Sequence, residues 1–361
     1  MRTAERASTD AGADSAARAG ALRWLISGYY GAGNLGDEAL LAGLLRALRA
    51  RGAEHLAVLS LDPPSTARQH AVRTHHRLLG LAPALLRSDV LVSGGGGLLQ
   101  DSTSARSLRY YLSVITLARR LRRRVVVYGQ SLGPLSDAGR ERVRAALPAV
   151  PLGLRDDPSL ALASALGLRA HSVADAALLL SPPPERPRAT LLLVPRGDQP
   201  LANAALATLA RRALAEGASV DALAFHPRHD ASACEALAAA VPGVRASVVT
   251  DPGAALEAMA GARLVVSVRL HGLILATLAR APHVALSYDP KVAGFAQRSG
   301  ATCHQAPDSA AASDALATSL EAAWRSPRFD DAARAQLLDQ AERGVDWLVW
   351  HALHGHAAAT T

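Results

Sequence analysis

Short apolar runs that end in glycine-rich or polar clusters, each followed by a helical stretch, are the feature that most limits how this chain can fold. The first run covers residues 22–27, and the stretch after it places leucines from Leu40 to Leu48 on one helical face. The pattern recurs at 55–61, 90–93, 125–128 and 152–154, and again at 191–194, 221–225, 264–268 and 284–287. Strands that alternate with helices in this way form parallel sheets covered on both faces, so the predicted fold class is α/β.

A proline-rich segment at 181–188, SPPPERPR, separates two series of such runs. Four prolines in eight residues cannot continue a strand or a helix, so this segment is predicted to be a linker. The chain is expected to have a disordered tail at 1–21, an N-terminal Rossmann-like domain at 22–180 and a C-terminal Rossmann-like domain at 189–361. The second domain is expected to end in an amphipathic helix over about residues 330–354.

Composition and charge exclude several classes of protein. Half of the 361 residues are apolar, too many for a disordered chain. The formal net charge is +8 without a nucleic-acid recognition motif, so attraction to an anionic bilayer surface is favoured over nucleic-acid binding. The two cysteines, Cys234 and Cys303, form neither a disulfide framework nor a zinc pattern. Since neither a signal peptide nor a membrane span is predicted, the expected location is the cytoplasm, with peripheral contact at the inner membrane face.

The polar clusters that could carry chemistry follow the predicted strands. In parallel sheets, ligands bind beyond the carboxyl ends of the strands. The sequence therefore predicts an active site in a cleft between the two halves of the chain.

The segment GAGNLG at 31–36 matches the dinucleotide pattern G-x-G-x-x-G. Asp37 and Glu38, however, place two carboxylates where a pyrophosphate needs bare amides. Binding of a polar substrate by Asn34, Asp37 and Glu38 is therefore favoured, with Asp37 as the N-cap of the following helix. An NAD(P) site and a purely structural tight turn remain as alternatives.

Four successive glycines at 94–97 follow another predicted strand. They can expose successive amides as an anion-binding nest, or allow a sugar to approach the backbone. Gly95 and Gly96, together with Gln100 and Asp101 just after them, are predicted to contact substrate.

Arg155 stands at the end of the run 152–154. An arginine there can hold a carboxylate or phosphate through two parallel hydrogen bonds. A salt bridge to Asp156 or Asp157 is the alternative.

Arg269 and His271 alternate along the chain at the end of an apolar strand and the start of an apolar helix. A cation, an imidazole and a helix N-terminus together suit an anionic substrate and proton transfer. Lys291 is the single lysine among 39 basic Lys and Arg residues, which suggests a role that arginine cannot fill. It follows Tyr288 and Asp289, again just past a predicted strand.

His226 begins the sequence His-Pro-Arg-His-Asp. The spacing permits metal ligation. Because the segment reads as a loop with no further ligand cluster, an active-site contact by His226 is favoured and no metal is predicted.

Seven motifs occur in the order found in polysaccharide pyruvyl transferases, and the chain most resembles the bacterial cell-wall branch of that family, called CsaB. The resemblance covers about residues 24–295. Its motifs are GNLGDE, SGGGGLLQDSTSARSLRYY, GQSLGPL, LRDDPS, VADAALL, VRLHGLILATLARAP and LSYDPKVAGF.

The resemblance implies a GT-B-like fold, with two Rossmann-like domains facing a cleft. It implies transfer of pyruvate from phosphoenolpyruvate to two hydroxyls of a sugar, commonly the 4- and 6-positions of N-acetylmannosamine, with release of phosphate and without a metal or nucleotide cofactor. In the cell-wall branch the acceptor is lipid-linked and the product helps to anchor surface-layer proteins. The family's essential arginine, histidine and lysine fall on Arg155, His271 and Lys291. Gly272 departs from the family, where alanine is frequent, and so do the tail and the residues after about 300.

The resulting hypothesis assigns phosphoenolpyruvate to Arg155, Arg269 and Lys291, and general acid–base catalysis to His271. The first half would hold the acceptor. Substrate contacts are predicted for Asn34, Asp37, Glu38, Gly95, Gly96, Gln100, Asp101, Gln130, His226, Tyr288 and Asp289.

Three other functions share these features. A GT-B nucleotide-sugar transferase or epimerase would bind a nucleotide in the second half. An NAD(P) oxidoreductase would bind its cofactor at 31–36. A sugar-binding protein without activity would leave Lys291 and His271 without a role.

Overall fold

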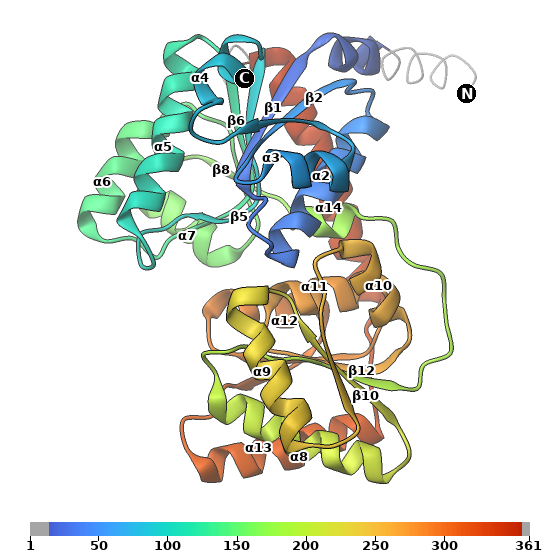
Figure 1. Cartoon of the computed structure of the whole chain (residues 1–361). Helices are drawn as coiled ribbons and strands as arrows, with labels where there is room; N and C mark the ends of the chain where they lie inside the picture. The colour runs from blue at the N-terminus through green and yellow to red at the C-terminus, as the bar shows by residue number, and fades with distance from the viewer. Residues whose placement is uncertain (1–13, 356–361) are drawn as a thin grey trace. The chain divides into compact units, whose positions relative to one another are not determined.

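The computed structural model describes residues 14–355, and the chain divides into two compact units (Figure 1). The first unit comprises Met1–Ala32, Leu40–Leu179 and Gln340–Thr361. The second comprises Gly33–Ala39 and Leu180–Asp339. Both units are built from a parallel sheet with helices, so the predicted α/β fold class is confirmed.

The first unit contains an eight-stranded parallel sheet. Its strand order is β3 (Arg73–His76), β2 (His55–Ser60), β1 (Arg23–Tyr30), β4 (Val90–Ser93), β6 (Arg124–Leu132), β7 (Leu152–Leu154) and β8 (Ala170–Ser172), with β5 (Gly96–Leu99) paired to β6. The chain runs outward in opposite directions from β1 and β4, which is the topological switch point where open α/β sheets bind ligands.

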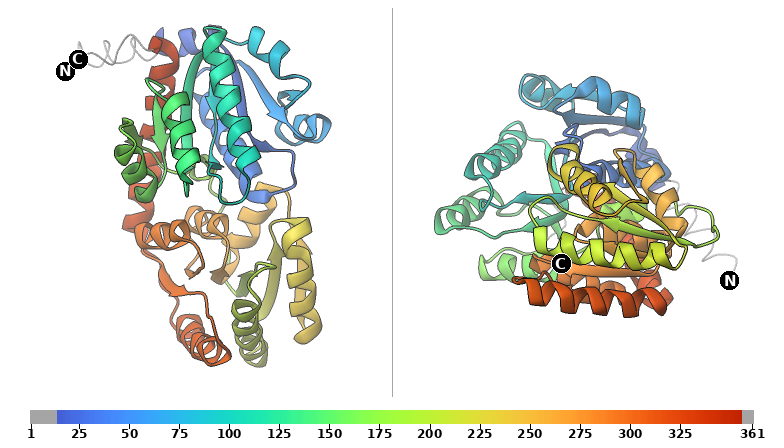
Figure 2. Two further views of the ribbon diagram at one scale, coloured as in Figure 1. Left: turned by 90° about the vertical axis from the view of Figure 1, so that its left-hand side faces the viewer. Right: turned by 60° about the horizontal axis from the view of Figure 1, so that its bottom comes forward.

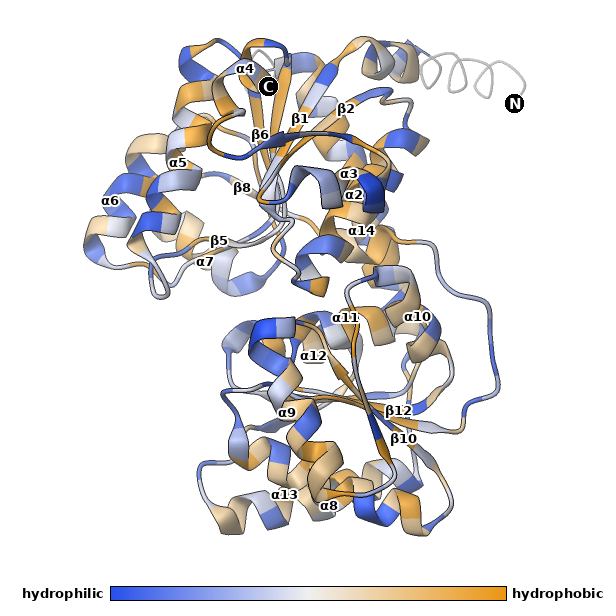
Figure 3. Ribbon diagram, viewed as in Figure 1, coloured by the Kyte–Doolittle hydropathy of each residue, from blue (hydrophilic) through white to orange (hydrophobic). Residues whose placement is uncertain are grey.

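Helices cover both faces of this sheet, as the two views in Figure 2 show. They are α2 (Leu35–Ala50), α3 (Pro63–His70), α4 (Leu81–Leu86), α5 (Ala105–Arg120), α6 (Asp137–Ala146) and α7 (Asp157–Ala165), followed by the 3-10 turn η1 (Ala176–Leu179). The core on one face joins Val125 and Val127 of β6 to Leu108 and Ile115 of α5, all buried. The apolar strands flanked by more polar helices are visible in Figure 3.

The second unit contains a six-stranded parallel sheet. Its order is β11 (Val244–Val248), β10 (Ser219–Ala224), β9 (Thr190–Val194), β12 (Ala262–Ser267), β13 (His283–Ser287) and β14 (Thr302–Gln305). Its helices are α8 (Pro200–Ala215), α9 (Pro227–Ala240), α10 (Pro252–Ala260), α11 (Leu270–Leu278), α12 (Pro290–Ser299) and α13 (Ala310–Arg325). The switch point of this sheet lies between β9 and β12.

The final helix, α14 (Asp331–His354), belongs to both units. Its residues from Gln340 onward are assigned to the first unit, where Arg51 pairs with Glu342 and Asp346. The prediction that the whole helix belongs to the C-terminal domain differs from this division, because apolar periodicity does not reveal which sheet a helix covers.

Two other boundaries bear on the predicted organisation. Residues 1–13 of the predicted tail lie outside the described residues, but residues 14–21 are helical and Ala19 is buried, its carbonyl accepting a hydrogen bond from Trp24 Nε1 (3.1 Å). The proline-rich stretch 181–188 contains no helix or strand. None of the helices within residues 14–355 is both long enough and apolar enough to cross a membrane.

Candidate active site

Arg155 lies just after β7, at the carboxyl edge of the first sheet, and its side chain is buried. Its Nη1 pairs with Asp175 Oδ2 at 2.5 Å, and its Nε donates to Ser131 Oγ at 2.9 Å. Ser131 Oγ in turn donates to Asp156 Oδ2 at 2.6 Å. The predicted alternative was a salt bridge to Asp156 or Asp157; Arg155 pairs with Asp175, twenty residues later, and is linked to Asp156 through the Ser131 hydroxyl.

Gln130 stands at the same edge, in β6, and is fully buried. Its Nε2 donates to Ser93 Oγ and to the carbonyl of Gly94, both at 2.8 Å. Within the described chain its Oε1 is a buried acceptor that no hydrogen bond satisfies. Since buried amides are rarely left half-used, this oxygen is a candidate contact for a donor group of a ligand.

The glycine segment does not form the predicted nest of exposed amides. Gly94, Gly95 and Gly96 are buried, Gly94 N donates to the carbonyl of Ser27 (2.8 Å), and β5 begins at Gly96. A Cβ at position 95 would lie 3.0 Å from the carbonyl oxygen of Gly129. The glycines therefore allow a short extra strand to pack closely beside β6.

Gln100 and Asp101 follow β5 and hold local loops. Gln100 Oε1 accepts from Ser102 Oγ (2.7 Å) and from Thr103 N (3.1 Å). Asp101 accepts from the hydroxyl of Ser136 (2.5 Å) and from its amide (2.9 Å), and these hydrogen bonds hold the pKa of Asp101 below its usual range. The ionised Asp101 carboxylate thus links its own loop to the loop that contains Ser136.

Asn34 rather than Asp37 stands at the start of α2. Asn34 Oδ1 accepts from Gly36 N (3.1 Å), and Asn34 Nδ2 donates to Asp37 Oδ2 (2.5 Å). The predicted N-cap role of Asp37 is wrong because the helix begins two residues earlier, at Leu35, which leaves Asp37 and Glu38 as buried carboxylates in the first turn.

The segment Gly33–Ala39 belongs to the second unit, where it reaches His271. Leu35 N donates to the carbonyl of Phe225 (2.9 Å), and a Cβ at position 36 would overlap the His271 ring. Only glycine at position 36 allows this approach, so the GNLGDE motif and the histidine meet at one place.

Arg269 and His271 flank the start of α11 at the carboxyl end of β12. Arg269 Nη2 pairs with Asp230 Oδ1 at 2.5 Å, and Asp230 is fully buried in the first turn of α9. The backbone of Arg269 is held on both sides by Ser267 Oγ, which accepts from its amide (3.0 Å) and donates to its carbonyl (2.7 Å). The guanidinium is therefore fixed at the end of the strand.

His226 precedes α9, and its Nδ1 accepts from Arg228 N (3.2 Å). Its ring centroid lies 4.2 Å from that of His229. Burial, followed by the neighbouring His229 and Arg269, lowers the pKa of His226, so the neutral imidazole is favoured. His226 Nδ1 is thus used by the backbone and Asp230 Oδ1 by Arg269, and the part of the chain that the structure describes has no cluster of three metal-ligating residues.

Arg196, at the end of β9, was not singled out from the sequence. Its guanidinium lies 4.3 Å from the ring centroid of Tyr288, donates to the Tyr288 hydroxyl, and pairs with Asp198 at 2.5 Å. Its signal was the same as that of Arg155: an arginine just after an apolar strand. Burial raises the pKa of Tyr288, so its hydroxyl stays protonated.

Lys291 lies in the first turn of α12, after β13. Asp289 is the N-cap, accepting from Lys291 N (3.0 Å), and its other oxygen lies 3.4 Å from Lys291 Nζ. Because β12 and β13 pair in parallel register, Ser267 opposite Ala285, the N-termini of α11 and α12 emerge from neighbouring strands. Arg269, His271, Tyr288, Asp289 and Lys291 are thereby brought to one edge.

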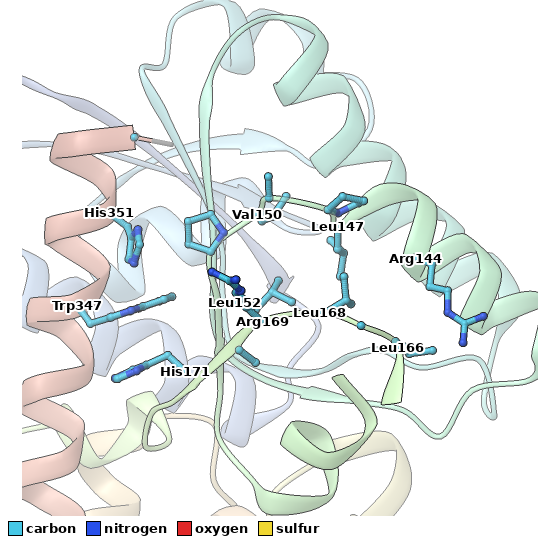
Figure 4. Close-up of a pocket in the computed structure, with 16 residues that line it drawn as sticks. Arg144, Leu147, Val150, Leu152, Leu166, Leu168, Arg169, His171, Trp347 and His351 are labelled. Carbon is cyan, nitrogen blue, oxygen red and sulfur yellow. The ribbon is translucent and has the colours of Figure 1, made fainter. Parts of the chain in front are cut away.

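A separate hollow of about 710 Å³ lies in the first unit (Figure 4). It is lined by apolar residues such as Leu147, Val150 and Leu168, and by His171 stacked on Trp347 with ring centroids 5.3 Å apart. It contains none of the predicted site residues and lies beside the amino ends of β7 and β8, away from the edge that holds Arg155.

Two Rossmann-like parallel sheets with polar groups at their carboxyl edges define a GT-B-like protein, and solved structures support this class. A glycosyltransferase from Rickettsia africae is similar with a TM-score of 0.60 at 9% identity, covering 93% of this chain and 100% of that one. UDP-GlcNAc 2-epimerase from Neisseria meningitidis, bound to UDP-GlcNAc, gives 0.63 at 8% identity, with 91% and 99% covered. Anabaena HepE in complex with UDP-glucose gives 0.58 at 13%, with 91% and 99% covered.

The chain belongs to the polysaccharide pyruvyl transferase family, whose model matches residues 34–290. This match includes the starts of α2, α11 and α12 and the buried Arg155. No curated protein matches the sequence.

Proposed function

We propose that the protein transfers pyruvate from phosphoenolpyruvate to two hydroxyls of a sugar in a cell-wall polysaccharide precursor. The observation that carries this proposal is the meeting of Arg269, His271 and Lys291 at two neighbouring helix N-termini of the second unit. Helix N-termini and cations suit the two anionic groups of phosphoenolpyruvate. Family membership gives the reaction class.

In the proposed reaction, Arg269 and Lys291 bind the carboxylate and phosphate. Arg269 is fixed by Asp230, and Lys291 is the compact charge that Asp289 keeps near the helix start. Arg155, in the first unit, is the third proposed contact of phosphoenolpyruvate, with an orientation set by Asp175 and Ser131.

His271 is the proposed general acid–base. The methylene carbon of phosphoenolpyruvate gains a proton, one acceptor hydroxyl loses its proton as it adds to C2, and the bond from C2 to the phosphate oxygen breaks so that phosphate leaves. The second hydroxyl then adds to the same carbon and loses its proton, so the products are the ketal and inorganic phosphate. Such proton transfer contributes about 10²–10⁴ in rate.

The acceptor is proposed to be N-acetylmannosamine, bridged at its 4- and 6-hydroxyls, within a lipid-linked or oligosaccharide precursor of the CsaB type. The proposed contacts of the acceptor are Asn34, Asp37, Glu38, Gln100, Asp101 and Gln130. The unsatisfied Oε1 of Gln130 supports a sugar hydroxyl as donor. The proposed location is the cytoplasm, at the inner membrane face. As in the cell-wall branch that the chain resembles, the pyruvylated product is proposed to help anchor surface-layer proteins.

The test is acceptor-dependent release of phosphate from phosphoenolpyruvate. We expect release by the native chain, loss of at least about 10²-fold in His271→Ala, and a large loss in both Lys291→Ala and Lys291→Arg, because arginine cannot replace the compact ammonium. His55→Ala, at an exposed strand start, is the matched control and should be unaffected. Equal release by native and His271→Ala proteins would refute the assignment.

A nucleotide-sugar transferase or epimerase is the second candidate, because two similar structures hold UDP-sugars. Thermal shift separates the two: stabilisation by phosphoenolpyruvate supports pyruvyl transfer, whereas stabilisation only by UDP-GlcNAc supports the second candidate.

A further inference from the structure

An apolar surface on the first unit points outward from the fold. Leu79 is 87% exposed, Leu78 is 61% exposed and Leu86 is 56% exposed, and Ala82 and Pro83 between them are also exposed. We call these five residues the leucine surface; Leu78 and Leu79 lie in the loop 77–80, and the other three lie in α4, which is labelled in Figure 1. Three large exposed leucines within nine residues are unusual for a soluble surface and indicate an interaction site.

The loop is a defined turn. The amides of Leu78 and Leu79 both donate to His76 Nδ1 (3.3 Å each), and Gly80 N donates to the His76 carbonyl (2.8 Å). The opposite side of α4 is anchored, since Ala84 and Leu85 are buried in the core. The leucines are therefore exposed to solvent, while the opposite side of α4 packs into the core of the first unit.

The surroundings of the leucine surface are strongly basic. Residues 63–88 contain four arginines and neither Asp nor Glu. Arg73 and Arg87 are exposed, five residues before Leu78 and directly after Leu86 in the sequence, while Arg77 lies 4.1 Å from the ring centroid of Tyr110 and so joins this segment to α5. Residues 102–136, which include α5, also lack Asp and Glu and carry exposed Arg106 and Arg109.

The charges of this segment also act on His75. Burial, and then the charges of Arg73 and Arg87, lower the pKa of His75. Exposed leucines bordered by arginines are the chemistry that recognises an anionic lipid surface, where apolar side chains enter the acyl boundary and guanidinium groups meet lipid phosphates. A second copy of the chain fits less well, because it would bring the same arginines together.

We propose that the leucine surface docks on an anionic lipid bilayer, with Leu78 and Leu79 inserted and Arg73 and Arg87 on the headgroups. The proposal deepens the proposed function, on which it rests for the lipid-linked acceptor. The loop leaves β3, whose carboxyl end lies at the same sheet edge as that of β1, because β3, β2 and β1 are parallel. Docking would therefore place the first unit, with its proposed acceptor contacts, at the surface where lipid-linked substrates lie.

Vesicle sedimentation of the full chain tests this proposal without phosphoenolpyruvate or acceptor. The vesicles are phosphatidylcholine alone or phosphatidylcholine with phosphatidylglycerol. We expect binding only to the anionic vesicles, weakened by added NaCl. The double variant Leu78→Ser with Leu79→Ser should bind at least about tenfold more weakly, and Arg73→Gln with Arg87→Gln about tenfold or more.

Matched controls come from the second unit: Val248→Ser replaces an apolar residue that is 48% exposed, and Arg328→Gln removes a charge outside the leucine surface. Both should bind as the native chain does. Equal vesicle binding by the leucine variant, or no vesicle binding by the native chain, would overturn the proposal. Sedimentation velocity would also overturn it if the native chain self-associates through this surface but does not bind vesicles, and the leucine variant no longer self-associates. Vesicle binding without phosphate release would refute the proposed function alone, and phosphate release without vesicle binding would refute this surface alone.

Discussion

Arg269 and Asp230 form a buried ion pair, with Arg269 Nη2 2.5 Å from Asp230 Oδ1, that ties the carboxyl end of β12 to the start of α9. Asp230 Oδ2 is buried and, among the described residues, without a hydrogen-bond partner. The pair therefore fixes a cation at the candidate anion site and leaves one carboxylate oxygen unused.

Asp230→Ala should destabilise the protein by about 3–5 kcal/mol, because it leaves the largely buried guanidinium without its partner. Urea denaturation followed by circular dichroism measures this. Asp198→Ala removes a more exposed partner, that of Arg196, and should cost less than about 1 kcal/mol. The paired variant Asp230→Leu with Arg269→Met should recover stability but not activity; recovery of both would contradict a substrate role for Arg269.

Arg155→Lys should lower kcat/KM by about 10²-fold while leaving the protein folded, because lysine lacks the planar fork through which the guanidinium contacts Asp175 and Ser131. Steady-state phosphate release and the melting temperature measure the two effects. Arg144→Lys, at the hollow of the first unit, is the matched control. An unchanged kcat/KM would show that Arg155 serves the fold only.

His283 should titrate near pH 4. Burial lowers its pKa to about 4, while its ring contacts the carbonyl of Ala281 (2.9 Å) and the hydroxyl of Thr277 (3.2 Å). Its pKa is lower in the folded than in the unfolded protein, where it is about 6.5. The contribution to stability is therefore complete above about pH 6.5 and is lost as the pH falls toward 4, by roughly 3 kcal/mol.

Nuclear magnetic resonance titration of the histidine ring protons checks this value directly. A short peptide with one histidine, titrated in the same buffer, supplies the reference value of about 6.5. Titration of His283 at that reference value would show that it is not buried in its neutral form.

Gly272→Ala should destabilise the second unit by about 1–3 kcal/mol, because a Cβ there would overlap Ser267 Oγ. That hydroxyl holds both backbone groups of Arg269, so activity should fall as well. Thermal denaturation of Gly272→Ala, alone and with Ser267→Ala, checks this: the second change should recover part of the stability. An unchanged melting temperature in the single variant would contradict the packing.

The central strands were predictable because they are continuous apolar runs, as in Leu191–Val194 of β9. β3 was missed because its sequence, Arg-Thr-His-His, is polar at a sheet edge, and β5 because it begins in a glycine run. Short edge strands owe their structure to a neighbour rather than to their own composition.

The candidate site was predictable in position but not in its contacts. The carboxyl-end rule indicated Arg155, Arg269 and Lys291. It could not indicate that Asp175 pairs with Arg155 or that Asp230 pairs with Arg269, because these partners come from other elements, twenty and thirty-nine residues away. The roles of all the named site residues stay predictions.

The most direct test of pyruvyl transfer is the mass of the acceptor after incubation with phosphoenolpyruvate. We predict that an N-acetylmannosamine-containing acceptor gains the mass of pyruvate less one water, as a ketal on two hydroxyls requires, in step with phosphate release, and that His271→Ala gives neither. Phosphate release with an unchanged acceptor mass, or a nucleotide-dependent gain of a sugar, would contradict pyruvyl transfer.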